Sequence, residues 1–120
     1  MKNDIFDIID QTLFIKPLSV NEAWQGKRFK TPKYKKFETD CLWLMNKESL
    51  PDAPYEFYYE FGFSSKLSDL LNPEKLITDI ICKKYGIDDR YITRMVLEKR
   101  IVPKGGEYIR FKISHAAPRS

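Results

Sequence analysis

Three aspartates and a lysine lie around the segment of this chain whose residue types best fit a chemical role. Asp69 comes just before a predicted helix, Lys75 falls in its first turn, and Asp88 and Asp89 follow its end. Carboxylates gathered in one place repel each other, and a hard cation such as Mg²⁺ relieves that repulsion. A lysine in a first turn opposes the helix dipole, but it is well placed to meet a phosphate bound there. Together these groups indicate metal-assisted hydrolysis of a phosphodiester.

A purely structural interpretation of the same residues stays open. Asp69 can be a turn residue, Asp88 and Asp89 can belong to a solvated loop, and Lys75 can pair with Asp79 one helical turn later. The carboxylates that follow the helix can approach those at its start only if the next strand runs back past the helix start. The residues alone therefore do not decide between a split carboxylate site and a solvated surface.

The helix between these groups is predicted from its ends and from its apolar face. Asn72 is a good N-cap, Pro73 suits a first helical position, and Gly86 is a natural stop. The apolar face recurs at helical spacing and consists of Leu76, Ile77, Ile80, Ile81 and Tyr85.

The order of these motifs resembles the RusA family of Holliday-junction resolvases. The family's Asp-x-Asp-Asn segment is matched by Asp69-Leu70-Leu71-Asn72, its lysine by Lys75, and its Asp-Asp pair by Asp88-Asp89. The resemblance runs from about Leu13 to Ile113. It also includes Ser19-Val20-Asn21 after an early strand and a proline, and a late turn at Lys104-Gly105-Gly106.

The resemblance implies a metal-dependent endonuclease that resolves four-way DNA junctions in recombination and repair. It implies that Asp69 and Asp89 hold Mg²⁺, with Asp88 close by and with Mn²⁺ as a substitute metal, and that Lys75 offsets charge on the scissile phosphate. It further implies a homodimer that presents one site to each of two symmetric strands. Small resolvases of this type often belong to phage or prophage genomes.

One position departs from the family pattern. Where the family has the second aspartate of its Asp-x-Asp motif, this chain has Leu71, and a leucine cannot bind a cation. The chain is then a weakly active enzyme, an enzyme that recruits Asp88, Asp79 or Glu74 instead, or a junction-binding protein that does not cut. The resemblance does not decide which of Asp88 and Asp89 is the ligand.

A basic stretch earlier in the chain is the candidate DNA-binding surface. The segment from Lys27 to Lys36 carries six basic residues and no acidic one, with Phe29 inside it and Trp24 close by. Basic side chains bind phosphates and aromatic rings stack on unpaired bases. The alternatives are a solvated loop whose aromatic residues enter the core, or a small interaction domain with no nucleic-acid role. The predicted DNA-binding residues are Lys27, Arg28, Lys30, Lys33, Lys35, Lys36 and Lys66.

Composition limits the class of protein. A chain of 120 residues with 42% hydrophobic residues suits one domain with a modest core. The formal net charge of +4 is mild evidence for a polyanionic partner. No apolar run approaches transmembrane length, and the N-terminus lacks the features of a signal peptide. Cys41 and Cys82 each fall in a predicted helix, on or beside its apolar face, which favours buried free thiols over a disulfide or a zinc site. Together, these features lead us to expect a soluble cytoplasmic protein.

The remaining elements predict an α+β fold: one RusA-like domain with a mixed sheet of about four strands, and two main helices mainly on one side. A helix capped by Thr31 fades near Ser49, and Pro103 to Gly106 makes a hairpin turn between the last two strands. Residues 1–11 form an N-terminal extension, residues 18–30 a loop, and residues 114–120 a tail. The predicted strands are Thr12–Lys16, Tyr55–Phe63, Tyr91–Val102 and Glu107–Ile113.

Overall fold

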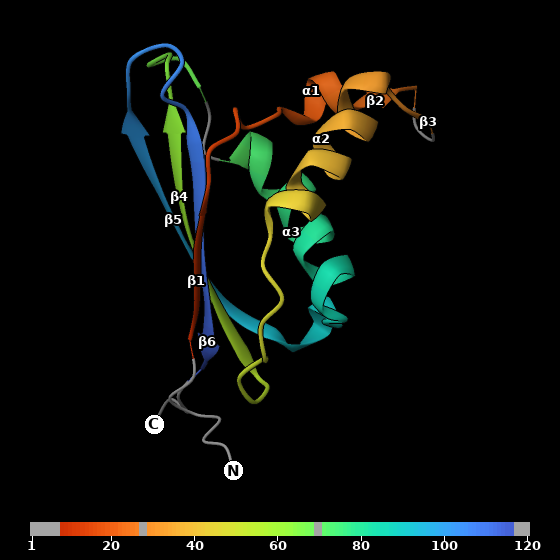
Figure 1. Cartoon of the computed structure of the whole chain (residues 1–120), viewed down its shortest axis with the longest axis vertical. Helices are drawn as coiled ribbons and strands as arrows, with labels where there is room; N and C mark the ends of the chain where they lie inside the picture. The colour runs from red at the N-terminus through yellow and green to blue at the C-terminus, as the bar shows by residue number, and fades with distance from the viewer. Residues whose placement is uncertain (1–7, 27–28, 69–70, 117–120) are drawn as a thin grey trace.

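A mixed four-stranded sheet forms one layer of the molecule and the helices form the other (Figure 1). The computed structural model describes residues 8–26, 29–68 and 71–116, without the side chain of residue 25. The strand order is β1-β6-β4-β5, with β5 parallel to β4 and the other neighbours antiparallel. The sheet strands are β1 Ile9–Leu13, β4 Tyr55–Phe63, β5 Ile92–Ile101 and β6 Tyr108–His115.

The helices cover one face of this sheet, as the α+β prediction requires (Figure 1). The two main ones are α2, Pro32–Leu44, and α3, Leu71–Tyr85. Between β1 and α2 lie a short helix α1, Val20–Ala23, and two short strands, β2 Trp24–Gln25 and β3 Phe29–Lys30. A 3₁₀ turn, Asp89–Tyr91, leads from α3 into β5.

Strand β4 forms the centre of the core because its side chains alternate between apolar and polar. Phe57, Tyr59 and Phe61 are fully buried beneath the helices, while Tyr58 and Glu60 lie on the opposite face. The bounds of β4 and its buried face agree with the prediction. Its helix-side neighbours include the buried residues Leu76, Ile77, Ile80 and Ile81 of α3, and Ile109, Phe111 and Ile113 of β6.

Helix α2 begins as its sequence predicts and ends earlier. The Thr31 side chain accepts a hydrogen bond from the backbone N–H of Tyr34, and Pro32 occupies the first helical position. The helix stops at Leu44 rather than near Ser49, because Met45 already has extended backbone. Of the predicted apolar stripe, Leu44 is exposed, and the buried members are Tyr34, Phe37, Cys41 and Met45.

Helix α3 ends where predicted and begins earlier. Gly86 follows the last turn with a φ of 68°, a left-handed conformation that glycine adopts without a steric penalty. The helix already includes Leu71 and Asn72, so the prediction of Asn72 as the N-cap was wrong. Pro73, the third residue of the helix, is tolerated in its first turn because the first N–H groups of a helix have no partner within it.

The predicted hairpin between the last two strands is wrong. Strand β4 lies between β5 and β6 and pairs with both, so the segment after β5 crosses the end of β4 before β6 returns antiparallel to it. The physical reason is burial, because β4 is the most apolar strand and gains most from a neighbour on each edge.

Both ends of the domain extend further than predicted. Strand β1 begins at Ile9 rather than Thr12, and it buries Ile9, Gln11 and Leu13 against β6. Strand β6 continues to His115, whose Nδ1 lies 2.9 Å from the carbonyl oxygen of Asp52, and Ala116 is buried. Parts of the predicted extension and tail therefore belong to the sheet.

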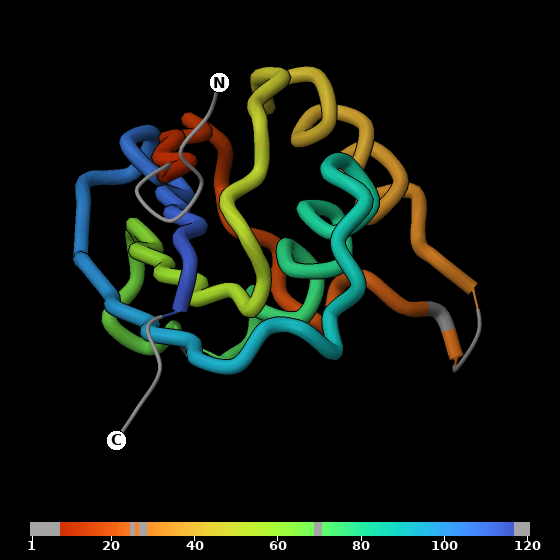
Figure 2. Tube along the Cα trace, turned by 90° about the horizontal axis from the view of Figure 1, so that it is seen from below, coloured from red at the N-terminus to blue at the C-terminus, as the bar shows by residue number. Residues whose placement is uncertain are grey.

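The β2–β3 hairpin projects away from the body of the molecule in both views (Figures 1 and 2). The segment from residue 18 to residue 30, predicted as a loop, contains α1 and these two strands. The two strands pair through Trp24 with Lys30 and Gln25 with Phe29. Among the described residues, no helix has the length and hydropathy that crossing a membrane would require.

Candidate functional site

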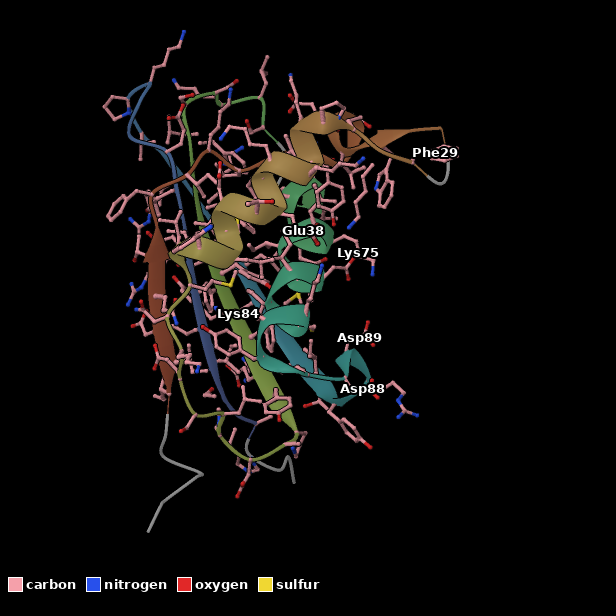
Figure 3. The ribbon with its side chains drawn as sticks, turned by 45° about the vertical axis from the view of Figure 1, so that its right-hand side comes forward. Phe29, Glu38, Lys75, Lys84, Asp88 and Asp89 are labelled. Carbon is pink, nitrogen blue, oxygen red and sulfur yellow. The ribbon has the colours of Figure 1, made fainter. Side chains whose placement is uncertain are left out.

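An open pocket of about 360 Å³ lies where α3 approaches the start of β5. Glu74, Lys75 and Thr78 line it from the helix, and Asp89 and Thr93 line it from the 3₁₀ turn and the strand. Figure 3 shows Lys75 and Asp89 projecting on the same side of the molecule. Because β5 runs back beside β4 beneath α3, the residues after the helix return to the level of its first turns. This arrangement is the one that a split site needs.

Lys75 makes an ion pair within its own helix. Its Nζ lies 3.1 Å from Oδ1 of Asp79, and the side chain of Lys75 remains 65% exposed. The hydrogen bond to Asp79 raises the pKa of Lys75, and the charges of Asp79, Asp89 and Glu74 add to the effect. The ion pair that the structural interpretation predicted is therefore present, and the ammonium group also faces the pocket that contains Asp89.

The structure separates the roles of Asp88 and Asp89, which the sequence left undecided. The carboxylate of Asp88 caps the 3₁₀ turn by accepting from the backbone N–H of Arg90, and its Oδ2 lies 2.7 Å from the Arg90 guanidinium. These two bonds lower the pKa of Asp88 below its ordinary value. Among the described residues, none donates a hydrogen bond to the Asp89 carboxylate or forms an ion pair with it. Of the two, only Asp89 lines the pocket.

Glu74 is held in place by a chain of hydrogen bonds that starts in the core. The Thr78 hydroxyl donates to Oε2 of Glu74 over 2.8 Å, and it lies 2.6 Å from the phenol oxygen of Tyr59. Since Thr78 donates to Glu74, Tyr59 must donate to Thr78. Burial raises the pKa of Tyr59 well above its ordinary value, so this phenol keeps its proton. Oε2 of Glu74 is thereby fixed at the wall of the pocket.

Neither Asp69 nor Leu71 supplies a described carboxylate to the predicted metal site. Asp69 lies outside the described residues, so the structure does not describe its position. Leu71, at the position of the missing family carboxylate, is 68% exposed in the first turn of α3. Among the described residues, there is no group of three or more His, Cys, Asp or Glu side chains that would hold a metal.

Cys82 lies on α3 within the electrostatic reach of the same carboxylates. Burial raises its pKa to about 11, and the charges of Asp89 and Asp79 contribute to the rise. A thiol with so high a pKa stays protonated at neutral pH, which makes it a poor nucleophile. Both cysteines are free, as predicted; Cys41 is also buried as expected, whereas Cys82 is only partly buried.

Most of the described lysines in the predicted DNA-binding set are neutralised by acidic neighbours. Lys30 lies 3.2 Å from Glu38, a residue of α2 that also lies 3.4 Å from Lys83. Likewise, Lys33 pairs with Glu22 and Lys36 with Asp40. The pair of Lys36 with Asp40 has the i,i+4 spacing of one helix, whereas the partners of Lys30 and Lys33 come from other elements, Glu38 of α2 and Glu22 of α1. Lys27 and Arg28 lie outside the described residues.

Lys35 and Lys66 differ from the paired lysines. Both side chains are exposed, and among the described residues no carboxylate forms an ion pair with either ammonium group. The backbone of Lys66 is held by Lys99 of β5, whose Nζ donates to the carbonyl oxygens of Lys66 and Ser68. Lys99 therefore anchors the segment that precedes Asp69.

The structure also separates the two aromatic residues of the basic stretch. Trp24 packs edge-on against Tyr34, with ring centroids 5.4 Å apart, and is 38% exposed. Phe29 is 72% exposed on the projecting β2–β3 hairpin (Figure 3). Trp24 therefore supports the hairpin, and Phe29 is the ring available to a partner.

The sequence interpretation named Glu74 only as one of three substitutes, and it missed Thr78 and Tyr59. A weak signal was present, because Thr78 follows Glu74 by one helical turn and a threonine on an apolar helix face needs a hydrogen-bond partner.

Comparisons with known proteins do not identify the chain, since no protein-family model and no curated protein matches it.

Proposed function

We propose that this protein is a metal-dependent, structure-specific endonuclease that cuts four-way DNA junctions, similar to the RusA-type resolvases. The observation that carries the proposal is the presence of Lys75 and Asp89 in one open pocket. Lys75 lies near the start of α3, and Asp89 lies in the 3₁₀ turn that follows its end. A cation for the phosphate and a carboxylate without a partner among the described residues are the pair that this chemistry requires. The resemblance of the motif order supplies the substrate class.

The acidic residues of the pocket fit a hard cation. Mg²⁺ is commonly bound through one or two carboxylates, with water and substrate phosphates completing its shell. In this proposal Asp89 and Asp69 hold Mg²⁺, or Mn²⁺ in its place, and Glu74 supplies the carboxylate that Leu71 lacks. Asp79 and Asp88 are less suited to that role because they are paired with Lys75 and Arg90. A bound metal would supply an activated water and would stabilise charge on the scissile phosphate.

Lys75 would bind the scissile phosphate in this proposal. Its ion pair with Asp79 is exposed, and exposed pairs contribute only about 0 to 1 kcal/mol. Exchange of the Asp79 carboxylate for a phosphate oxygen is therefore inexpensive. The side chain is already directed toward the pocket, so the exchange needs only a rotamer change.

The DNA arms would lie along the β2–β3 hairpin and the start of α2. Phe29 offers an exposed ring at this surface, and Lys35 offers an exposed ammonium group. Lys30, Lys33 and Lys36 would exchange their carboxylate partners for phosphates, which makes affinity fall steeply with salt. Lys27 and Arg28 would extend the same surface, and Lys66 would contribute near α3. A homodimer would present two sites to the two strands that are cut.

A second candidate function has its own support. Leu71 is exposed and apolar at the position of a family carboxylate, and the described residues include no ready three-ligand group. On that basis the protein would bind four-way junctions without cutting them. Both functions predict salt-sensitive junction binding, so cleavage is the measurement that separates them.

The test is cleavage of a labelled four-way junction with Mg²⁺ or Mn²⁺, beside a linear duplex of the same sequence. The wild type is compared with Asp89→Asn, Asp69→Asn and Leu71→Asp, and with Asp52→Asn as a control at an exposed aspartate away from the pocket. We expect junction-selective cutting by the wild type and by Asp52→Asn, and loss of about 10²-fold or more in Asp89→Asn and Asp69→Asn.

Other outcomes have distinct meanings. Junction binding without cutting by the wild type would establish the second function, and restoration of cutting by Leu71→Asp would identify the cause. Absence of any junction binding by the wild type would exclude both functions. DNA binding that is not weakened when the basic residues from Lys27 to Lys36 are all neutralised would favour an interaction domain with no nucleic-acid role.

A further inference from the structure

Strand β5 presents a long edge that no other described strand covers. It is 10 residues long, it lies at the end of the sheet, and its only described strand neighbour is β4. The opposite edge strand, β1, is only 5 residues long. A long edge strand exposes a row of backbone N–H and C=O groups, which is a template for pairing with another strand.

The register with which β5 would pair with its own copy is restricted by geometry. A two-fold axis perpendicular to the sheet brings two identical edges together antiparallel. Residues directly opposite each other must then point to the same face, so the axis passes midway between one residue and its own copy, and the register is centred on that residue. With the axis at Val96, Arg94 lies opposite Glu98 of the second copy, and this pair occurs twice. In the same register Met95 lies opposite Leu97, on the face that the helices cover.

Neighbouring registers lack this complementarity. An axis at Leu97 places Arg94 opposite Arg100. An axis at Arg94 places that arginine opposite the arginine of the second copy, and an axis at Glu98 does the same with the two glutamates. An axis through Met95 pairs neither Arg94 nor Glu98 with a charge. Like charges directly opposite each other destabilise a sheet, and opposite charges stabilise it. A register centred on Lys99 pairs Glu98 with Arg100 and Leu97 with Ile101, but it places Lys99 opposite its own copy. Among the registers centred on residues 94 to 99, only the one centred on Val96 pairs charged and apolar residues favourably without opposing like charges.

The two charged side chains remain available for this pairing. Arg94 is 51% exposed, and its contact with Glu56 of β4 is long, at 3.8 Å. Glu98 is exposed, and one of its oxygens, Oε1, accepts a hydrogen bond from Tyr58 of the same neighbouring strand. Both intrachain partners lie on the β4 side, so the outer side of each charged group faces the open edge.

We propose that a second copy of this chain docks on the β5 edge, with the two β5 strands antiparallel and Val96 on the two-fold axis. The inference starts from the dimer of the proposed function and specifies its contact. The axis preserves the two faces of the sheet, so the helices of both copies lie on one side. The pocket contains Thr93 and Met95, a few residues from the axis. The two pockets therefore open on the same side of the joined sheet and flank its centre.

A charge exchange tests this contact without DNA or metal. The mass of the wild-type protein is measured by sedimentation equilibrium over a range of concentrations. We expect a dimer whose dissociation constant rises about tenfold or more in Arg94→Glu and in Glu98→Arg, since each change places like charges in two symmetric pairs. The double variant Arg94→Glu/Glu98→Arg restores the opposite-charge pairing and returns the constant to within about threefold of the wild type. Lys104→Glu, the same charge reversal in the turn after β5, leaves it unchanged.

A disulfide test fixes the register independently. Val96→Cys places two thiols opposite each other at the axis, where the Cβ atoms of paired strands lie about 4.5 to 5.5 Å apart. Mild oxidation is expected to yield a covalent dimer from Val96→Cys and none from Arg100→Cys or from the wild type with its own cysteines.

A wild-type protein that is monomeric at all concentrations would overturn the inference. So would a dimer that both single charge reversals leave intact, or cross-linking as efficient in Arg100→Cys as in Val96→Cys. Since no DNA is present, a dimer that fails to cut junctions would count against the proposed chemistry and not against this contact. A monomeric protein that cuts junctions would count against this contact and not against the proposed chemistry.

Discussion

The phenol oxygen of Tyr59 and the hydroxyl oxygen of Thr78 lie 2.6 Å apart in the core, and Thr78 passes the hydrogen bond on to Glu74 at the pocket. Tyr59 is fully buried on β4, and Thr78 is nearly so on α3. The contact therefore ties the central strand to the helix that carries Lys75. It also connects the stability of the fold with the position of a pocket carboxylate.

Replacing Thr78→Val keeps the shape of the side chain and removes the hydroxyl. We expect a loss of about 1 to 3 kcal/mol in the free energy of unfolding, because the buried Tyr59 phenol is left without a partner. Urea denaturation measures it, with Thr78→Ser as the control that keeps the hydroxyl. In the double variant with Tyr59→Phe, the cost should be less than the sum of the single costs. Additive costs would mean that the two groups do not interact.

The three acidic substitutes named for Leu71 are distinguished by metal binding. We expect Glu74→Gln to weaken Mn²⁺ binding about tenfold or more, because it removes a charged oxygen from the pocket. Asp88→Asn should change it little, since Asp88 caps the 3₁₀ turn and pairs with Arg90. Asp79→Asn should act through Lys75 and alter cleavage more than metal binding. Calorimetric titration with Mn²⁺ provides the measurement, and equal weakening by Glu74→Gln and Asp88→Asn would contradict the assignment.

The β2–β3 hairpin allows a matched pair of aromatic substitutions. Phe29→Ala should leave folding unchanged and weaken junction binding by about 1 to 3 kcal/mol, the usual contribution of one stacked base. Trp24→Ala should lower the free energy of unfolding by about 1 kcal/mol or more, because the ring packs edge-on against Tyr34. Fluorescence anisotropy with a labelled junction and thermal melts separate the two effects. Unchanged binding by Phe29→Ala would remove the hairpin from the DNA interface.

The pair formed by Asp10 of β1 and Arg110 of β6 predicts an acid-dependent loss of stability. The hydrogen bond from Arg110 lowers the pKa of Asp10 below its ordinary value of 3.8. A carboxyl whose pKa is lowered by folding stabilises the protein above its unfolded pKa, and this contribution disappears as pH falls through the folded value. The wild type should therefore exceed Asp10→Asn in stability by a constant, small amount between about pH 7 and pH 5. The difference should vanish near pH 2, and a difference that persists there would contradict the assignment.

Local patterns in the sequence determined much of the fold. Alternating aromatic residues specified β4 from Tyr55 to Phe63, Thr31 and Pro32 specified the start of α2, and Gly86 specified the end of α3. These features depend on backbone conformation and side-chain periodicity within a few residues, which is why they are legible without a structure. The α+β class followed from their order.

Local sequence patterns predicted only part of the candidate site. The sequence indicated Lys75 and Asp89 as chemically suited groups, and the structure places both in one pocket. Only the structure distinguishes Asp89, which lines the pocket, from Asp88, which caps the 3₁₀ turn, and only the structure shows that Thr78 donates to Glu74. Two of the acidic partners of the basic stretch, Glu22 of α1 and Glu38 of α2, are brought to Lys33 and Lys30 by the packing of separate elements.

The sequence by itself determined the approximate positions of the main strands and helices, and which side chains are chemically suited to a site. Only the tertiary structure decided that β4 separates β5 from β6, and that β1 begins at Ile9. It also decided that no other described strand pairs with the outer edge of β5. Local preferences arise from each residue's own dihedral angles and near neighbours. The choice of strand partner depends instead on backbone hydrogen bonds and apolar contacts between distant residues, and on the competition among all strands for the buried position at the centre of the sheet.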